Sequence, residues 1–501
     1  MKKINNVFFM LILIMTSFAG CSDFLEEVPK SVINSETFYK TESDAVAALN
    51  AVYDYMTVGT LGIFDDGFGG IFFNDFWVIK DILSDNCEET ITSPEYQDLS
   101  EFKFNPDNIR IEFYWEDIYK TIFASNVVIN RVPLIDMDSM KRNHLVSEAR
   151  FIRALMYFEA VRLFGEVPLL LKETSSVKEA SISRSKVSDI YKAIVDDLKY
   201  SSEHLSDSYR VGNGRPVPMS CIALLSKVYL EMGEYQLAAD NAEIVIGSGE
   251  FKLWADYADI FKLENMNQGE IIFAANFSGS LSQGFKPNQY HVRLLPTEIY
   301  DSSRGEGPKN AWGWERPTEN LINSYTPLDR RAEVTFINSF TYSDGETISF
   351  DNHIGKFWDQ ENEPEGNNTS TDVIYLRYAD VLLIYAEALN ELNKGPNEMA
   401  YDAINKVRAR ARFNGIEVLD ILPDLDGLSY QQFKDAVLLE RRWEFVMEGQ
   451  RYHDLVRMGK LEEKVNGSGK ENTTAQSHHV LLPIPQRERN LNPQLTQNDG
   501  Y

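Results

Sequence analysis

Apolar residues recur at the three- and four-residue spacing of amphipathic helices over much of the chain. Such stripes run along residues 43–56, 145–164 and 185–250. A helix with one apolar stripe buries it against a neighbouring helix and leaves its polar face to solvent. The pattern therefore predicts a mostly α-helical protein.

Two stretches of this pattern are typical of tetratricopeptide-like helix pairs. In residues 222–249, Ala238 and Ala242 stand where two helices must approach closely, and small side chains permit that approach. A second copy begins near Ala379 and resumes at Ala400 after a turn. The fold expected from this spacing is a scaffold of tetratricopeptide-like helix pairs that a long insertion splits in two.

Helical periodicity fades in the insertion, which is rich in glycine and holds short β-prone runs at 271–275 and 334–340. Long loops inside a compact protein are usually functional, because ordering them costs conformational entropy. We therefore expect the insertion to face a ligand. The predicted parts are a helical part over 41–250, an irregular, ligand-facing insertion over 251–372, a second helical part over 373–460 and an irregular C-terminal segment over 461–501 packed on the body.

The N-terminus has the features of a lipoprotein signal. Lys2 and Lys3 precede a mainly apolar stretch over residues 7–19, which is too short to span a bilayer. Small residues directly before Cys21 resemble a bacterial lipobox, with Phe18 where leucine is usual. We expect removal of residues 1–20, lipid on Cys21 and a lipid-anchored tether over 21–40. The alternative is an ordinary signal peptide with a cysteine at its end by chance.

Composition and charge narrow the choice of function. The chain has 501 residues, of which 43% are hydrophobic, and its formal net charge is −27. Nucleic-acid binding depends on cationic contacts to phosphates, so this charge argues against a nucleic-acid partner. Cys87 and Cys221 allow at most one further disulfide, and no segment after the signal holds 18 uninterrupted apolar residues.

Several phrases along the chain resemble the RagB/SusD family of outer-membrane nutrient-uptake lipoproteins. They are EARFIRA at 148–154, FGEVP at 164–168, LRYADVLL at 376–383, AEALN at 386–390, RYHDLVR at 451–457 and LPIP at 482–485. The resemblance implies a protein of the outer membrane, anchored by lipid and facing the exterior. It also implies capture of a glycan or other nutrient and delivery to a TonB-dependent, SusC-like transporter.

Arginines and carboxylates alternate within these phrases. A guanidinium group is planar and suits bidentate pairing with a carboxylate between packed helices, so we expect buried ion pairs that set helix register. The alternative is that the arginines form an anion or substrate site. The residues concerned are Arg150, Arg153, Arg377, Arg408, Arg441 and Arg442, with Glu148, Asp380, Glu387 and Glu440.

No sequence motif calls for an enzyme, a cofactor or a metal site. The chain contains no Gly-rich phosphate loop, no His-Glu-x-x-His, no Gly-x-Ser-x-Gly and no Cys-x-x-Cys. The side chains of the adjacent His478 and His479 diverge in either helix or strand, which disfavours a shared metal. We predict no catalytic residue, although a surface glycosidase remains an alternative.

Two aromatic clusters have the composition of a sugar site, in which ring faces pack on pyranose C–H groups and polar side chains bind hydroxyls. Side chains at i and i+2 of an extended loop point the same way, so Trp312 and Trp314 are expected to form one platform. The alternatives are that these rings pack in the core, or that the scaffold binds a peptide. Trp358 and Tyr290 are weaker candidates. The predicted ligand-binding residues are Phe73, Asn74, Asp75 and Trp77 in one cluster, and Trp312, Trp314 and Arg316 in the other.

Overall fold

The structure is a computed structural model that describes residues 38–57, 70–91, 93–209, 214–278, 288–309, 311–358 and 369–501. The predicted signal peptide, Cys21 and nearly all of the predicted tether lie outside these residues. Within the described ranges, none of the helices combines the length and apolarity that a membrane span requires.

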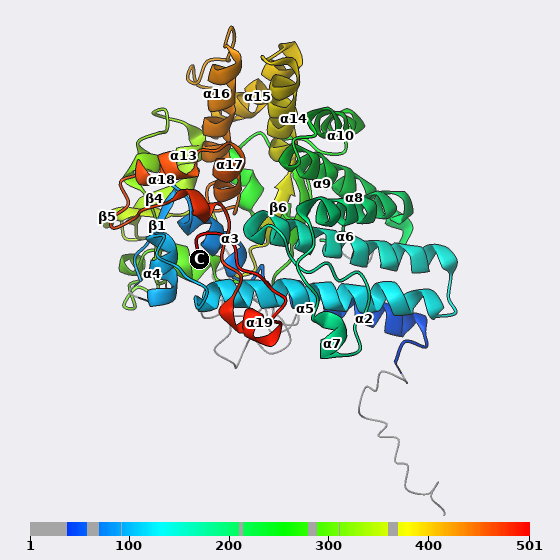
Figure 1. Ribbon diagram of the computed structural model, residues 1–501. Helices are drawn as coiled ribbons and strands as arrows, with labels where there is room; N and C mark the ends of the chain where they lie inside the picture. The colour runs from blue at the N-terminus through cyan, green and yellow to red at the C-terminus, as the bar shows by residue number, and fades with distance from the viewer. Residues whose placement is uncertain are drawn as a thin grey trace, which may run out of the picture.

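The described chain is mostly helical, as the hydrophobic pattern predicts (Figure 1). The helices are α2 Glu42–Thr57, α3 Asp75–Ile82, α4 Pro94–Ser100, α5 Ile109–Arg131, α6 Ser139–Phe164, α7 Val177–Ala180, α8 Val187–His204, α9 Pro218–Glu231, α10 Tyr235–Ser248, α11 Tyr290–Leu294, α12 Glu319–Ile322, α13 Arg330–Thr335, α14 Tyr378–Asn393, α15 Glu398–Ala411, α16 Tyr430–Glu444, α17 Arg451–Arg457, α18 Leu461–Asn466 and α19 Gln486–Leu491. The stripes over 43–56 and 145–164 correspond to α2 and α6.

The two predicted helix pairs are α9 with α10 and α14 with α15. Helix α10 packs directly on α14, so the pairs are neighbours in space although the insertion separates them in sequence. Ala238, Ala242 and Ala400 are fully buried where the helices meet. The preceding helices continue the stack, with α8 against α9, α6 against α8 and α5 against α6 (Figure 1).

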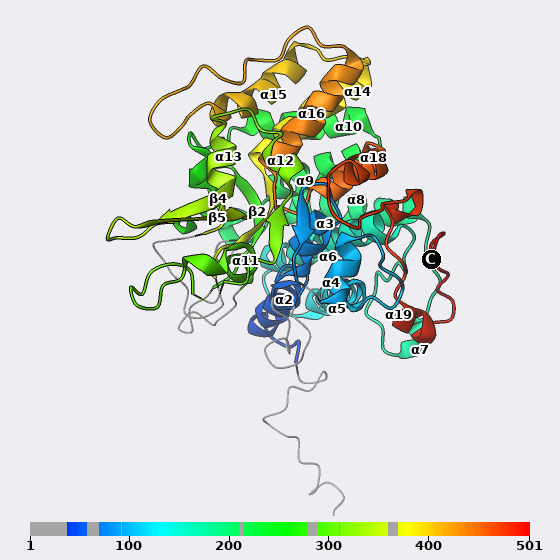
Figure 2. The same ribbon diagram turned by 90° about the vertical axis from the view of Figure 1, so that its left-hand side faces the viewer.

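The strands of the described chain form three two-stranded antiparallel sheets. They are β1 Cys87–Glu89 with β3 Glu315–Pro317, β2 Ile271–Ala275 with β6 Val373–Arg377, and β4 Phe336–Thr341 with β5 Thr347–Ile354. The sheet of β2 and β6 closes the base of the insertion, because one strand enters it and the other leaves it. The insertion then lies beside the helical body, with α11, α13, β4 and β5 on one side of the molecule (Figure 2).

The β-prone run at 271–275 is confirmed as β2, whereas the run at 334–340 is only partly correct. Residues Val334 and Thr335 end helix α13, and β4 begins at Phe336. Asp329 accepts a hydrogen bond from the backbone N–H of Arg331 and so caps the start of α13. This local cap outweighs the β propensity of the β-branched residues that follow it.

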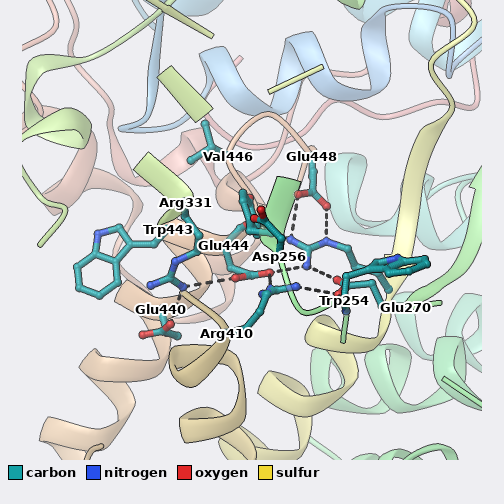
Figure 3. Close-up of polar contacts among 12 residues, drawn as sticks. Trp254, Asp256, Glu270, Arg331, Arg410, Glu440, Trp443, Glu444, Val446 and Glu448 are labelled. Carbon is teal, nitrogen blue, oxygen red and sulfur yellow. Dashed lines mark hydrogen bonds and ion pairs between the residues drawn. The ribbon is translucent and has the colours of Figure 1, made fainter. Parts of the chain in front are cut away.

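Buried ion pairs join the end of β6 to helices α15 and α16. Arg377 lies within 2.5 Å of Glu444, 2.8 Å of Glu448 and 2.9 Å of Glu270. Figure 3 shows Arg410 reaching Glu270 and Glu444 from α15, and Arg331 reaching Glu440 and Glu444 from α13. We call these seven residues the Arg377 network.

Charge in the Arg377 network is balanced locally. Burial alone would favour the neutral form of Glu444, but the charges of Arg410, Arg377 and Arg331 outweigh it and hold its pKa below the ordinary value. The carboxylate is therefore ionised at neutral pH and binds three guanidinium groups. Each cation comes from a different element of the fold.

The other arginines of the family-like phrases are also paired with carboxylates, as predicted. Arg153 is 2.8 Å from Asp197, Arg408 is 2.8 Å from Glu440 and Arg441 is 2.7 Å from Asp380. The remaining pairs are Arg150 with Asp197, Arg442 with Asp85, Glu148 with Arg215 and Glu387 with Arg457. Cys87 and Cys221 are separate, buried thiols.

Replacing Arg377 with alanine is expected to lower the free energy of unfolding by about 3 to 5 kcal/mol, because it removes the cation shared by three buried carboxylates. Chemical denaturation followed by circular dichroism measures this change. Arg487→Ala is the control: its ion pair with Glu112 is at the surface, so the loss should stay below about 1 kcal/mol. Unchanged stability of Arg377→Ala with loss of ligand binding would favour an anion site instead.

Candidate ligand-binding site

The rings of Trp312 and Trp314 stack on one another, with centroids 4.2 Å apart and an interplanar angle of 25°. The two side chains lie together, as predicted, but the loop is not extended between them, because Gly313 has a φ of +60°. Their backbone N–H groups donate to carbonyl oxygens of α11, from Trp312 to Val292 at 2.5 Å and from Trp314 to Arg293 at 2.7 Å. Helix α11 therefore sets the position of both rings, and each ring is half-buried.

Gly313 makes this arrangement sterically feasible. Its φ of +60° lies in the left-handed region, and a Cβ added there would come within 2.8 Å of His353 Nε2 and 3.2 Å of the Leu295 carbonyl oxygen. A glycine avoids both the backbone strain and the collision. The Trp-Gly-Trp order is thus a structural requirement of the stacked pair.

A buried arginine, whose charge is balanced by carboxylates, packs against the tryptophan pair. The Arg293 guanidinium is 4.9 Å from the ring of Trp314 and pairs with Glu315 and, at 3.3 Å, with Glu89. Burial, reinforced by the nearby charge of Glu315, raises the pKa of Glu89 to about 9. At neutral pH Glu89 keeps its proton, so one carboxylate balances one guanidinium. Trp314 therefore contacts both Arg293 and Trp312, and Trp312 remains partly exposed.

Polar groups surround the ring pair. The Thr90 hydroxyl donates to the carbonyl oxygen of Trp314 at 2.9 Å and thereby links the N-terminal part of the chain to this loop. Arg316, two residues beyond Trp314, forms an ion pair of 3.1 Å with Asp351 of β5, whose side chain is largely exposed. An apolar ring face beside a guanidinium and a carboxylate is suited to a flat ligand that carries hydroxyl groups.

The first aromatic cluster does not form an exposed loop, so that prediction is wrong for three of its residues. Asn74 is 1% exposed, Asp75 4% and Trp77 0%, while Phe73 is half-buried. Asp75 and Trp77 belong to α3, all of whose residues are buried. The four apolar residues directly after Asp75, Phe76–Ile79, were the available signal, because such a run extends around most of one helical turn and favours burial.

Trp77 nevertheless supports the site through its contact with helix α11. Its ring stacks on Tyr290 at 4.5 Å, and Tyr290 stacks on Phe357 at 4.1 Å. Tyr290 is the first residue of α11, the helix whose carbonyl groups hold the loop of Trp312 and Trp314. Two predicted candidates, Trp77 and Tyr290, are thus brought together as a support and not as a ligand-contacting surface.

The described residues contain no cluster of three or more histidine, cysteine, aspartate or glutamate side chains arranged to hold a metal ion. Trp443 is buried and donates from its indole N–H to Ser324. Trp358 is half-buried and lines a cavity together with Ala258 and Phe261.

Stacked helix pairs and a loop-rich insertion closed by two strands define a helical-repeat scaffold with a large insertion. A sequence model of the SusD family matches residues 341–501, and a model described as starch-binding and associating with the outer membrane matches residues 23–230. SusD-like protein P2 of Formosa agariphila is 30% identical, and the alignment covers 100% of both chains. This protein belongs to the SusD family.

Other relatives and solved structures agree with this assignment. Starch-binding protein SusD of Bacteroides thetaiotaomicron is 24% identical, with 87% of each chain covered. A laminarin-binding SusD-like protein has a TM-score of 0.74 at 26% identity, over 92% of this chain and 100% of that one. A SusD superfamily protein from Parabacteroides distasonis has a TM-score of 0.77 at 25% identity, over 92% and 99%.

Replacing Gly313 with alanine is expected to destabilise the protein by about 1 to 3 kcal/mol and to separate the two tryptophan rings, because the added Cβ is strained and collides with His353. Near-ultraviolet circular dichroism should show loss of the signal from the stacked indoles. Gly345→Ala is the control, since Gly345 also has a positive φ but faces open space. Equal effects of the two substitutions would contradict the role of the collision.

Proposed function

We propose that this protein is a surface-exposed, lipid-anchored outer-membrane protein that binds a glycan or oligosaccharide and delivers it to a TonB-dependent, SusC-like transporter. The observation that carries the proposal is the stacked pair of Trp312 and Trp314 on the insertion. The names of relatives support the ligand class, because one binds starch and another binds laminarin.

The geometry of the pair suits a sugar ring. Trp314 contacts both Arg293 and Trp312, and the exposed part of the Trp312 ring would serve as a rigid apolar surface for a ligand. The C–H face of a pyranose packs on such a surface by dispersion and by exclusion of water. The ion pair of Arg316 and Asp351 supplies a hydrogen-bond donor and an acceptor, and neighbouring hydroxyl groups of a sugar need both.

The N-terminus and the matched family description support the proposed location. A lipobox-like sequence ends at Cys21, and the model that matches residues 23–230 is described as associating with the outer membrane. More than one acyl chain on the cysteine would anchor the protein durably. Delivery to a transporter rests on the resemblance to the family. The protein acts in this scheme by binding and not by catalysis.

Trp312→Ala is expected to weaken glycan binding by about 1 to 3 kcal/mol, which is the loss of one aromatic anchor and corresponds to roughly 5- to 150-fold in Kd. A glycan array identifies a ligand, with soluble starch and laminarin as first probes, and calorimetry then measures affinity. Phe123→Ala is the control, because Phe123 is an exposed aromatic residue on α5. Unchanged affinity in both Trp312→Ala and Trp314→Ala would refute the site.

Blank arrays, combined with capture of peptides, would favour a peptide-binding scaffold instead. Release of reducing ends from a polysaccharide would contradict the proposal that the protein only binds.

Cys21→Ala is expected to release the protein from the membrane fraction, because no residue remains to carry lipid. Fractionation of cells that express each form measures this, and metabolic labelling with a fatty acid tests the modification directly. Cys221→Ala is the matched control, since the Cys221 thiol is buried in α9. Membrane retention of Cys21→Ala would contradict the lipid anchor, and protection of the wild type from protease on intact cells would contradict exposure to the exterior.

A further inference from the structure

Three cavities are lined in part by residues 258–268, and none of them is lined by Trp312 or Trp314. A cavity of about 210 Å³ and one of about 450 Å³ share Asn267 as a lining residue. The 450 Å³ cavity and a third, of about 390 Å³, share Glu264. We call this series the 258–268 groove. It follows the segment that leads from the helical body into β2.

The middle of the groove presents an organised set of amide and carboxylate groups. The Asp372 carboxylate accepts hydrogen bonds from the side-chain amides of Asn267 at 3.1 Å and Asn276 at 2.5 Å, and from the Phe277 N–H at 2.9 Å. These bonds fix the orientation of both amides. Gln268 and Glu264 line the same cavity and are exposed, as are parts of the apolar Leu263 and Met266. Fixed amides beside apolar side chains are the chemistry that binds sugar hydroxyls and C–H faces.

One end of the groove carries an aromatic ring with an unused donor. Trp358 lines the 390 Å³ cavity, and its indole N–H is buried without a hydrogen-bond partner in the part of the chain that the structure describes. A buried N–H without an acceptor costs free energy, and a ligand oxygen would recover this cost if rotation of the ring brought the N–H to the cavity. Trp358 packs near Phe340 of β4, and this contact orients the ring.

The cations near Trp358 are already matched by carboxylates. Lys262 is 2.7 Å from Asp259, Arg330 is 2.9 Å from Asp256, and Lys356 is 2.7 Å from Glu448. No excess positive charge results from these pairs, so the groove suits a neutral ligand and not an anionic one. The length of the groove, with three adjoining cavities, suits a chain of several units.

The groove and the loop of the tryptophan pair are both joined to the segment of strands β4 and β5. Asp351 of β5 pairs with Arg316 beside the tryptophans, whereas Gly355 and Trp358, directly after β5, line the groove. We infer that the 258–268 groove is a second binding site for a neutral polyhydroxylated chain, with Trp358 and Asn267 as its contacts. It extends the proposed function, because one long glycan held at two sites would dissociate more slowly than a short one.

The test compares variants of the full chain by calorimetry with soluble starch, laminarin and short oligosaccharides of each. Trp358→Ala removes the ring, whereas Trp358→Phe keeps a smaller aromatic ring without the N–H. Asn267→Gly removes the amide while glycine adopts the φ of +61° found there. Each is made alone and combined with Trp312→Ala. We expect at least a tenfold loss of polysaccharide affinity in Trp358→Ala and Asn267→Gly, and a smaller loss in Trp358→Phe. The single variant Trp312→Ala should keep residual binding, and adding Trp358→Ala to it should abolish that binding.

The outcomes separate the two sites. Wild-type affinity in Trp358→Phe and Asn267→Gly, both with unchanged melting temperature, overturns the groove, even if Trp358→Ala fails to fold. Loss of all binding in Trp312→Ala alone also overturns the groove but supports the tryptophan pair. Residual binding in Trp312→Ala that depends on Trp358 supports the groove whether or not the tryptophan pair is the stronger site. Absence of binding by the wild type to every probe overturns both.

Discussion

Arg377 and Arg410 share the carboxylates of Glu270 and Glu444 in the interior of the molecule, and the rest of the architecture depends on this arrangement. A charge withdrawn from water is tolerated only when its partners are in place, so no member of the network can be buried alone. Glu270 directly precedes β2, and Arg377 ends β6. The same ion pairs therefore hold both ends of the insertion against helices α15 and α16.

This constraint explains how a split repeat behaves as one scaffold. Helices α10 and α14 pack together despite the insertion between them, because the pairing of β2 with β6 brings the two ends of the insertion side by side. The loops of the insertion then extend from a rigid base. The stacked pair of Trp312 and Trp314 is positioned by α11, which in turn rests on the buried stack of Tyr290 and Trp77. The buried core thus holds the binding groups of these loops in defined positions.

The parts of the site that follow from local geometry were predictable. The close spacing of Trp312 and Trp314 in the chain indicated that they lie together, and the intervening glycine allows their rings to stack. The arginines of the family-like phrases are paired, as their chemistry suggests, but their partners could not be named beforehand. Glu270, Glu444 and Glu448 bind Arg377 from distant positions, and a sequence read in order offers no signal for such a meeting.

Helix periods and the small residues at helix contacts were determined by the sequence alone, because each depends on residues within a few positions of one another. Only the tertiary structure decided which aromatic rings are buried and which remain exposed. Trp77 is buried because Tyr290 covers it, and Trp358 lines a groove because residues 258–268 lie opposite. Burial is a property of contacts between segments far apart in the chain, so only the assembled fold distinguishes a supporting ring from one that a ligand can reach.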